Sequence, residues 1–298
     1  MGANRLVPGP VRRIVRLGVG SYGRLTADHR VLPSFLLCGG HRCGTTMLAR
    51  ALSAHPAVLT AVPRRPVHYF DTGYDRGPRW YRAHFPTQRA ADRIAWRLGV
   101  PPVTFESNPD YLYHPHAVAR IARDLPEVRV IVLVRDPVDR AYSHHAQQVA
   151  RGFEPERDLR RALALEPMRL RGEYERMVAD PGYRSLAHQH YGYRARGDYA
   201  RYLARMATYL PRERILVLET GDLLGHPESV YDRVLEFLGL PHLGYPPLDP
   251  PRPDPPSARV DARVRQEMAV YYAARDAELE PWLGHPPSWR AVAADAPA

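Results

Sequence analysis

Lysine is absent from this chain, although 42 of its 298 residues are basic. Every permanent side-chain cation is therefore an arginine, which stays charged and binds an oxyanion through two parallel hydrogen bonds. A coding bias that also enriches alanine and proline is the simplest explanation of this absence. The chemical consequence is the same: any role that needs a cation falls to arginine or to protonated histidine.

Long apolar runs and cysteines are also scarce. No run of about 18 apolar residues occurs, so the sequence predicts no transmembrane helix. The beginning of the chain lacks the apolar stretch of a secretory signal. Cys38 and Cys43 are the only cysteines and lie too close in sequence to staple a fold. We therefore expect a reduced, cytoplasmic setting.

The formal net charge of +10 suits an anionic substrate or a membrane surface. We find no recognised nucleic-acid-binding motif, and we expect no nucleic-acid partner. Residues 1–32 form a basic arm that contains a short amphipathic segment. Two interpretations of this arm stay open: packing on the domain, or weak contact with an anionic membrane surface.

Apolar segments alternate with helical patterns along the rest of the chain. We expect strands near Ser34–Gly39, Val58–Thr60, Pro101–Phe105, Arg129–Val134 and Arg214–Leu218. We expect helices near Thr46–Ser53, Trp80–Phe85, His116–Asp124, Pro137–Ala150, Glu156–Asp180, Tyr199–Leu210, Pro227–Leu238 and Arg259–Leu279. This alternation predicts an α/β fold, a central parallel sheet with helices on both faces. No repeat or linker is evident, so residues 33–298 are assigned to a single domain.

The segment SFLLCGGHRCGTTML, residues 34–48, predicts a buried strand, a tight turn and a helix in direct succession. Its glycines permit the turn, and its threonines can cap a helix that begins near Met47. The residues concerned are Gly39, Gly40, Gly44, Thr45 and Thr46. Such a helix N-terminus favours an anion. The turn is P-loop-like, but it lacks the Gly-Lys-Ser/Thr ending of a nucleoside triphosphate site.

A second segment with anion-binding character begins where a predicted strand ends. Arg135 lies at that carboxyl end, the usual place for ligand contacts in open α/β sheets. Ser143 follows eight residues later on a helix that begins with proline. The two side chains can hold one phosphate group. We expect Arg140 to pair with Asp136 or Asp139 on the surface of this helix.

Taken together, the two segments resemble the phosphate-binding motifs of sulfotransferases that use 3′-phosphoadenosine 5′-phosphosulfate (PAPS). Residues 67–71 (VHYFD), 79–86 (RWYRAHFP) and 105–115 (FESNPDYLYHP) resemble heparan sulfate and related bacterial sulfotransferases. Residues 196–227 resemble the later helix–strand segment of the bacterial members. The resemblance covers about residues 33–240. It implies a P-loop-like sheet, PAPS as co-substrate and adenosine 3′,5′-bisphosphate (PAP) as product.

The resemblance also implies a donor site. The 5′-phosphosulfate would be held by Gly40, Arg42, Cys43, Gly44, Thr45 and Thr46, and the 3′-phosphate by Arg135 and Ser143. Arg42 stands where the family usually has a lysine, which stabilises charge on the leaving phosphate; arginine is a poor proton donor. No metal is expected. The histidines, His144, His145, His188 and His190 among them, lack ligand spacing and are taken as surface or helix residues.

The catalytic base is less directly readable, because Pro66 occupies the place of the glutamate that relatives commonly carry. His68 is the first choice, since its ordinary pKa lies near neutrality, and Asp71 would orient it. Glu106 is the competing base. The structural alternatives are a histidine packed beside aromatic neighbours and, for Glu106, an internal ion-pair partner. Ser107 replaces a lysine of the heparan sulfate enzymes.

The expected reaction moves a sulfuryl group from PAPS to a hydroxyl of a carbohydrate, glycolipid or natural product by in-line displacement. A catalytically silent PAPS- or nucleotide-binding protein is the first alternative, and Pro66 is the feature that favours it. A P-loop kinase is the second, and it would need the absent lysine. The family loop that closes over the donor has no clear counterpart; Pro246–Arg259 is the candidate, with Arg252 or Arg259 as donor contacts.

Overall fold

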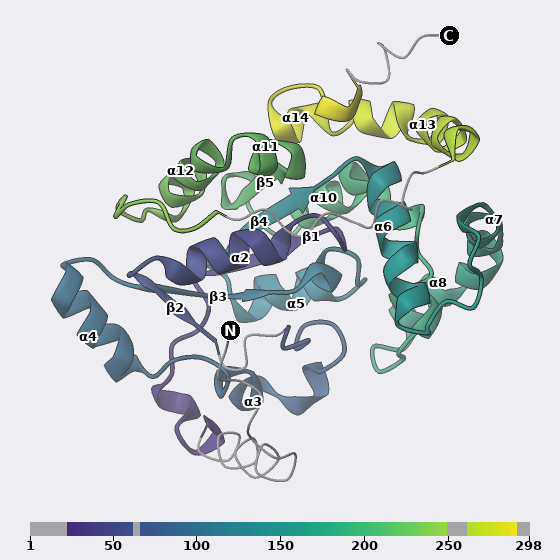
Figure 1. Ribbon diagram of the computed structural model, residues 1–298. Coiled ribbons are helices and arrows are strands. Elements are labelled where there is room, and N and C mark those ends of the chain that lie inside the picture. The colour runs from purple at the N-terminus through teal and green to yellow at the C-terminus, as the bar shows by residue number, and fades with distance from the viewer. Residues whose placement is uncertain (1–22, 62–65, 249–260, 291–298) are drawn as a thin grey trace, which may run out of the picture.

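The computed structural model describes residues 23–61, 66–248 and 261–290 (Figure 1). Within these ranges, one parallel sheet is built from β1 (Phe35–Gly39), β2 (Val58–Thr60), β3 (Val103–Ser107), β4 (Arg129–Val134) and β5 (Ile215–Glu219). The strand order is β2-β3-β1-β4-β5. Each predicted strand is confirmed to within two residues at either end. The α/β fold with a central parallel sheet in a single domain is also confirmed.

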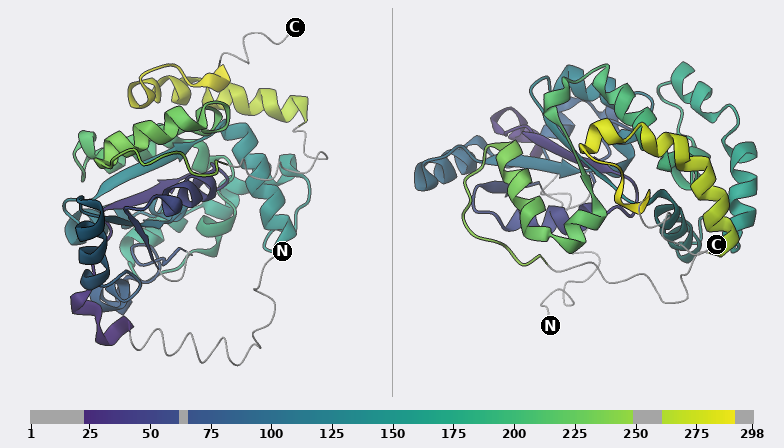
Figure 2. Two further views of the ribbon diagram at one scale, coloured as in Figure 1. Left: turned by 60° about the vertical axis from the view of Figure 1, so that its left-hand side comes forward. Right: turned by 90° about the horizontal axis from the view of Figure 1, so that it is seen from above.

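Helices lie on both faces of the sheet (Figures 1 and 2). They are α2 (Thr45–Ala54), α3 (Pro78–Arg82), α4 (Gln88–Leu98), α5 (Ala117–Asp124), α6 (Pro137–Ala150), α7 (Leu159–Leu170), α8 (Glu173–Ala179), α9 (Leu186–His190), α10 (Tyr199–Ala207), α11 (Thr220–Gly225), α12 (Pro227–Leu238), α13 (Ala262–Ala277) and α14 (Glu280–Leu283). In Figure 1, α12 and α13 lie above the sheet, and α3 lies below it.

The central strands carry the core of the domain. Every residue of β1 is buried, and in β4 only Arg129, at its start, is exposed. A parallel strand that is covered on both faces reads as one apolar run, which is why these strands were readable from the sequence. The carboxyl ends of all five strands meet at one edge of the sheet, so the loops that follow them are brought together there.

One predicted helix is corrected and one observed helix was not expected. The helix expected over 156–180 is split into α7 and α8, because Gly172 has a left-handed φ of 73° and is the N-cap of α8. Helix α4 was not predicted, because its apolar face is short and only Ala91 is fully buried along it. It is capped by the Thr87 side chain, which accepts a hydrogen bond from the Ala90 N–H.

Several predictions fall on parts of the chain outside the described residues. These are residues 1–22 of the basic arm and residues 249–260, with Arg252 and Arg259. Among the helices that are described, none is long and apolar enough to cross a membrane. Cys38 and Cys43 are buried free thiols.

Candidate functional site

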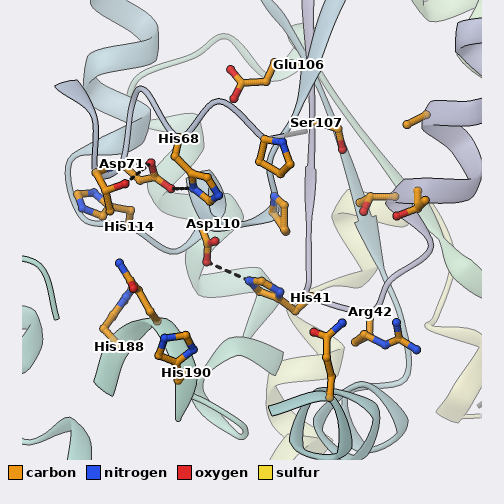
Figure 3. Close-up of a pocket in the computed structure, with 18 of the residues that line it drawn as sticks. His41, Arg42, His68, Asp71, Glu106, Ser107, Asp110, His114, His188 and His190 are labelled. Atoms are coloured by element: carbon orange, nitrogen blue, oxygen red, sulfur yellow. Dashed lines mark hydrogen bonds and ion pairs between the residues drawn. The ribbon is translucent and has the colours of Figure 1, made fainter. Parts of the chain in front are cut away.

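A cavity of about 1500 Å³ lies at the carboxyl edge of the sheet. It is lined by most of the predicted site residues, namely Arg42, Gly44, Thr45, Thr46, His68, Asp71, Glu106 and Arg135. Gly40, Cys43 and Ser143 are not among its lining residues. Figure 3 shows Arg42 across the cavity from His68 and Asp71, with His41 and Asp110 between them.

The turn after β1 depends on two glycines. Gly39 has a φ of 139°, and a Cβ there would lie 2.4 Å from the Leu133 carbonyl oxygen. Gly44 has a left-handed φ of 82° and is the N-cap of α2. The expected capping by Thr45 and Thr46 is therefore wrong, because both belong to the first turn of a helix that starts at Thr45. The first N–H groups of such a helix have no intrahelical acceptor and can bind an anion.

Thr220 and Tyr199 hold this turn against the end of β4. The Thr220 hydroxyl lies 2.9 Å from the carbonyl oxygens of both Cys43 and Val134, which share its single proton. The Tyr199 hydroxyl donates to the Arg135 carbonyl at 3.0 Å. Neither residue was singled out from the sequence, because nothing local marks a hydroxyl that reaches a loop so distant along the chain.

The two phosphate motifs meet in the structure. Arg42 adopts a φ of 73°, which is uncommon outside glycine. Its Nε donates to Ser143 Oγ at 2.7 Å, and Arg135 Nη1 donates to the Arg42 carbonyl at 3.3 Å. Residues assigned separately to the 5′- and 3′-phosphates thus form a single corner that we call the cationic corner: Arg42, Arg135 and Ser143.

His68 and Asp71 form a hydrogen-bonded pair on the facing wall. His68 Nδ1 lies 2.7 Å from Asp71 Oδ2, and Asn108 Nδ2 lies 3.4 Å from the same oxygen. Burial lowers the pKa of His68, but its hydrogen bond to Asp71 and the charge of that carboxylate outweigh burial and raise the pKa to about 9. His68 is therefore protonated at neutral pH, unlike a histidine with an ordinary pKa.

Glu106 is buried at the end of β3 and accepts three hydrogen bonds. Its Oε1 accepts from Tyr111 Oη and the Val67 N–H, both at 2.8 Å, and its Oε2 accepts from Tyr81 Oη at 2.9 Å. Burial raises the pKa of Glu106 to about 7, against the effect of these hydrogen bonds. Through Val67, this carboxylate fixes the backbone next to His68.

Asp110 is a site residue that sequence reasoning missed. Its Oδ1 accepts from Arg196 Nη1 at 2.8 Å and lies 3.0 Å from His41 Nε2. Burial raises the pKa of Asp110, but His41 and Arg196 outweigh burial and hold it well below the usual range. Ligand atoms of His68, Asp71 and Asp110 all lie within 4.8 Å of one another, a grouping that sequence spacing did not reveal.

Histidines form much of the remaining wall (Figure 3). Burial lowers the pKa of His114 and of His188 to about 3, so both imidazoles are neutral. His190 Nδ1 lies 3.1 Å from Gln148 Oε1, and its ring stacks on Phe153 at 4.2 Å. A neutral imidazole can both donate and accept a hydrogen bond, as a hydroxylated ligand requires.

The paired histidines lie on helices, as expected, with His144 and His145 on α6 and His188 and His190 on α9, but they are not plain surface residues. His188 and His190 line the cavity. His144 and His145 are buried, the former with no exposed surface. The spacing of these residues along the chain was uninformative, because the cavity wall is assembled from α6, α9 and the loop before α9.

The predicted surface pairing of Arg140 is also wrong. Arg140 is fully buried, and its Nη2 donates to the Tyr193 carbonyl. Arg265 of α13 takes the two carboxylates instead: its Nη1 lies 3.1 Å from Asp136 Oδ2, and its Nη2 pairs with Asp139 Oδ1. The helical spacing was correct, but the face of α6 that carries Arg140 packs inward.

A parallel sheet whose carboxyl edge carries a glycine turn, a helix N-terminus and two arginines is an arrangement typical of α/β proteins that bind an oxyanion. A family model described as "Sulfotransferase domain" matches residues 32–246. The chain belongs to this sulfotransferase family.

Known relatives support the same assignment. The chain is 31% identical over 213 residues to heparan sulfate glucosamine 3-O-sulfotransferase 6 of Mus musculus, covering 71% of this chain and 53% of the relative. It is 29% identical over 230 residues to bifunctional heparan sulfate N-deacetylase/N-sulfotransferase 4 of Mus musculus, covering 73% of this chain and 23% of that relative. The chain thus spans about half or less of these relatives. A sulfotransferase structure from Alicyclobacillus acidocaldarius matches with a TM-score of 0.63 and 26% identity, covering 87% of this chain and 99% of that one.

Proposed function

We propose that this chain transfers the sulfuryl group of PAPS to an acceptor hydroxyl and releases PAP. The observation that carries the proposal is the cationic corner, which joins the turn before α2 to the end of β4 through the contacts of Arg42 with Ser143 and Arg135. PAPS carries a 5′-phosphosulfate and a 3′-phosphate on the same ribose. Binding it therefore requires two neighbouring cationic groups, one for each phosphate. The absence of lysine argues against a nucleoside triphosphate site, and Arg42 takes the place of the family's lysine in the proposed donor site.

In the proposed reaction, the acceptor oxygen forms a bond to sulfur while the bond from sulfur to the 5′-phosphate oxygen breaks. Charge develops on the sulfuryl oxygens and on the departing phosphate, where Arg42 and the first N–H groups of α2 stabilise it. The acceptor proton passes to His68. To act as a base, the His68 imidazolium must first lose a proton. Because Asp71 holds Nδ1, this proton leaves from Nε2, and Nε2 then receives the proton of the acceptor.

The acceptor is proposed to be a hydroxylated molecule such as a glycan, glycolipid or natural product. The matched mouse protein named above is a glucosamine 3-O-sulfotransferase. In this chain, the neutral imidazoles of His114 and His188 offer hydrogen bonds without charge to an uncharged hydroxyl acceptor. The direct test is to incubate the protein with PAPS and hydroxylated acceptors and measure acceptor-dependent release of PAP.

That assay separates the proposal from its alternative. Tight PAP binding without release of PAP from PAPS, across glycan and small-molecule acceptors, would identify a silent nucleotide-binding protein. Pro66 in place of the usual glutamate is the feature that favours this alternative. Consumption of ATP in place of PAPS would contradict the proposed donor.

Arg135→Ala is expected to weaken PAP binding by about 100-fold, which corresponds to about 3 kcal/mol for a lost charge-assisted hydrogen-bond pair. Titration calorimetry with PAP measures this loss. Arg93→Ala on α4 is the matched control, because it removes an exposed arginine from a helix that contributes no residue to the cavity. Equal affinity of Arg135→Ala and wild type would refute the proposed 3′-phosphate site.

Glu106→Gln is expected to keep turnover within about fivefold, because the amide oxygen can still accept from Val67 and Tyr111 while Tyr81 turns its hydroxyl to accept from the amide. Glu106→Ala leaves buried donors without an acceptor and is expected to lower stability by about 2–4 kcal/mol. Thermal melts and turnover together test this. A fall of about 1000-fold in Glu106→Gln with an unchanged melting temperature would instead identify Glu106 as the base.

A further inference from the structure

Arg140 lies directly beneath the turn that follows β1. A Cβ built on Gly40 would meet its Cδ at 3.0 Å, so the arginine stem packs against the backbone of the turn. Its guanidinium is also close enough to Cys43 to lower the pKa of that thiol against the larger raising effect of burial. Glycine at position 40 is what permits this approach, since any side chain there would occupy the space of the arginine.

The guanidinium of Arg140 is incompletely paired for a buried cation. The side chain has no exposed surface, and Nη2 donates to the Tyr193 carbonyl. Its Nε and Nη1 have no hydrogen-bond partner among the described residues. No described carboxylate forms an ion pair with it, and the nearby Glu166 instead accepts from the Arg194 and Ala195 N–H groups.

Such a group is unfavourable for folding. Removing a charge from water costs several kcal/mol, and a carboxylate in contact is the usual compensation. Replacing a buried charged group by an apolar side chain of similar volume is often neutral or stabilising. The position of Arg140 therefore calls for a role other than stability, and the turn above it is the part of the molecule that an anion would occupy.

We propose that Arg140 is a buried positioning cation for the donor, whose charge, without an ion-pair partner among the described residues, raises the affinity of the turn at Gly40–Gly44 for the phosphosulfate group. It acts from below the backbone, without touching the ligand, while Arg42 and Arg135 act from the cavity side. In a low-dielectric interior, a cation at this place is weakly screened and favours an anion above the turn. This inference rests on the proposed function, because it assumes that the turn holds the 5′ end of the donor.

Arg140→Met is the test, because methionine approximates the buried stem and removes the charge. Its expected properties are a melting temperature of the ligand-free protein equal to or above wild type and an affinity for PAP about tenfold weaker. The loss is expected to persist at high salt, because the charge is buried. Arg140→Lys is expected to keep most of the affinity. Arg169→Met is the control: it removes the partner of buried Glu154, which Arg169 Nη1 contacts at 2.7 Å, and should lower the melting temperature without weakening PAP binding.

An Arg140→Met variant that binds PAP as tightly as wild type would overturn the inference. So would one that is unfolded or melts well below wild type, because that result shows a structural role. Inorganic sulfate is the second probe, since it requires only the turn. If wild type binds sulfate but not PAP, the proposed donor fails and the sulfate affinities of the two Arg140 variants still decide the role of Arg140. Binding of neither anion overturns both proposals.

Discussion

Arg42→Ala is expected to lower turnover by about 1000-fold, with a smaller effect on PAP binding. Arg42 is the cavity-lining cation that the turn before α2 supplies, and the charge that it meets is largest in the transition state. Removing one preorganised donor from such a site typically costs a factor of about 100–1000. Its left-handed φ of 73° also indicates that the backbone is held in an uncommon conformation in order to place this side chain.

The matched variant is Arg42→Lys, which restores the residue that the family usually carries. We expect it to keep turnover within about tenfold of wild type, because an ammonium also supplies charge and adds a proton donor for the departing phosphate. Pre-steady-state and steady-state release of PAP, measured at saturating PAPS, separates these effects from binding. Full turnover in Arg42→Ala would show that the first N–H groups of α2 stabilise the transition state without this side chain.

The same corner explains how a chain without lysine can serve this family. Arg42 does not stand alone: its Nε is held by Ser143, and its carbonyl accepts from Arg135. The fork of an arginine is rigid and needs such orientation, whereas a lysine can adjust its single charged end. Thr220 and Tyr199 then fix the backbone on either side. A lysine side chain could reach the donor through its own flexibility. Here the Arg42 side chain is oriented by hydrogen bonds between the turn and the residues at and after the end of β4.

The sequence predicted those parts of the molecule whose structure is determined by a local residue pattern. The interior strands were predicted because parallel strands covered on both faces are continuous apolar runs, as in β4. The phosphate motifs were predicted because each lies directly after such a strand. Their meeting through Arg42 and Ser143 joins residues far apart in the chain, which spacing alone does not reveal.

The errors at Arg140 and His144 have a common physical origin, since both concern which face of α6 packs inward. Arg140 was assigned to the helix surface and His144 to a surface or helix position, yet both side chains are buried. On α6 the inward face carries polar residues, so the usual contrast between an apolar and a polar face did not indicate its orientation. The protonation state of His68 was also unreadable, because its pKa depends on burial and on the carboxylates of Asp71, Asp110 and Glu106 in the assembled site.

His68→Ala is expected to lower turnover by about 1000-fold, within the range that general acid–base residues contribute. The pH dependence is the more specific readout. Because the pKa of His68 is about 9, only about 1% of it is neutral at pH 7, and kcat/KM is expected to rise with pH until about 9. Asp71→Asn removes the charge that raises this pKa, so the rise should move to lower pH. In His68→Ala this rise of kcat/KM with pH should be absent.

The stability of the ligand-free protein supplies an independent check on this pair. A raised pKa in the folded state stabilises the protein fully below the unfolded value near 6.5, and this contribution is lost as the pH rises through about 9. Wild type should therefore lose melting temperature relative to Asp71→Asn between those pH values. If the rise of kcat/KM appears in wild type and survives in His68→Ala, another group is the base. Glu106 would then be the next candidate for the base, and its pKa of about 7 would set the midpoint of the kcat/KM profile.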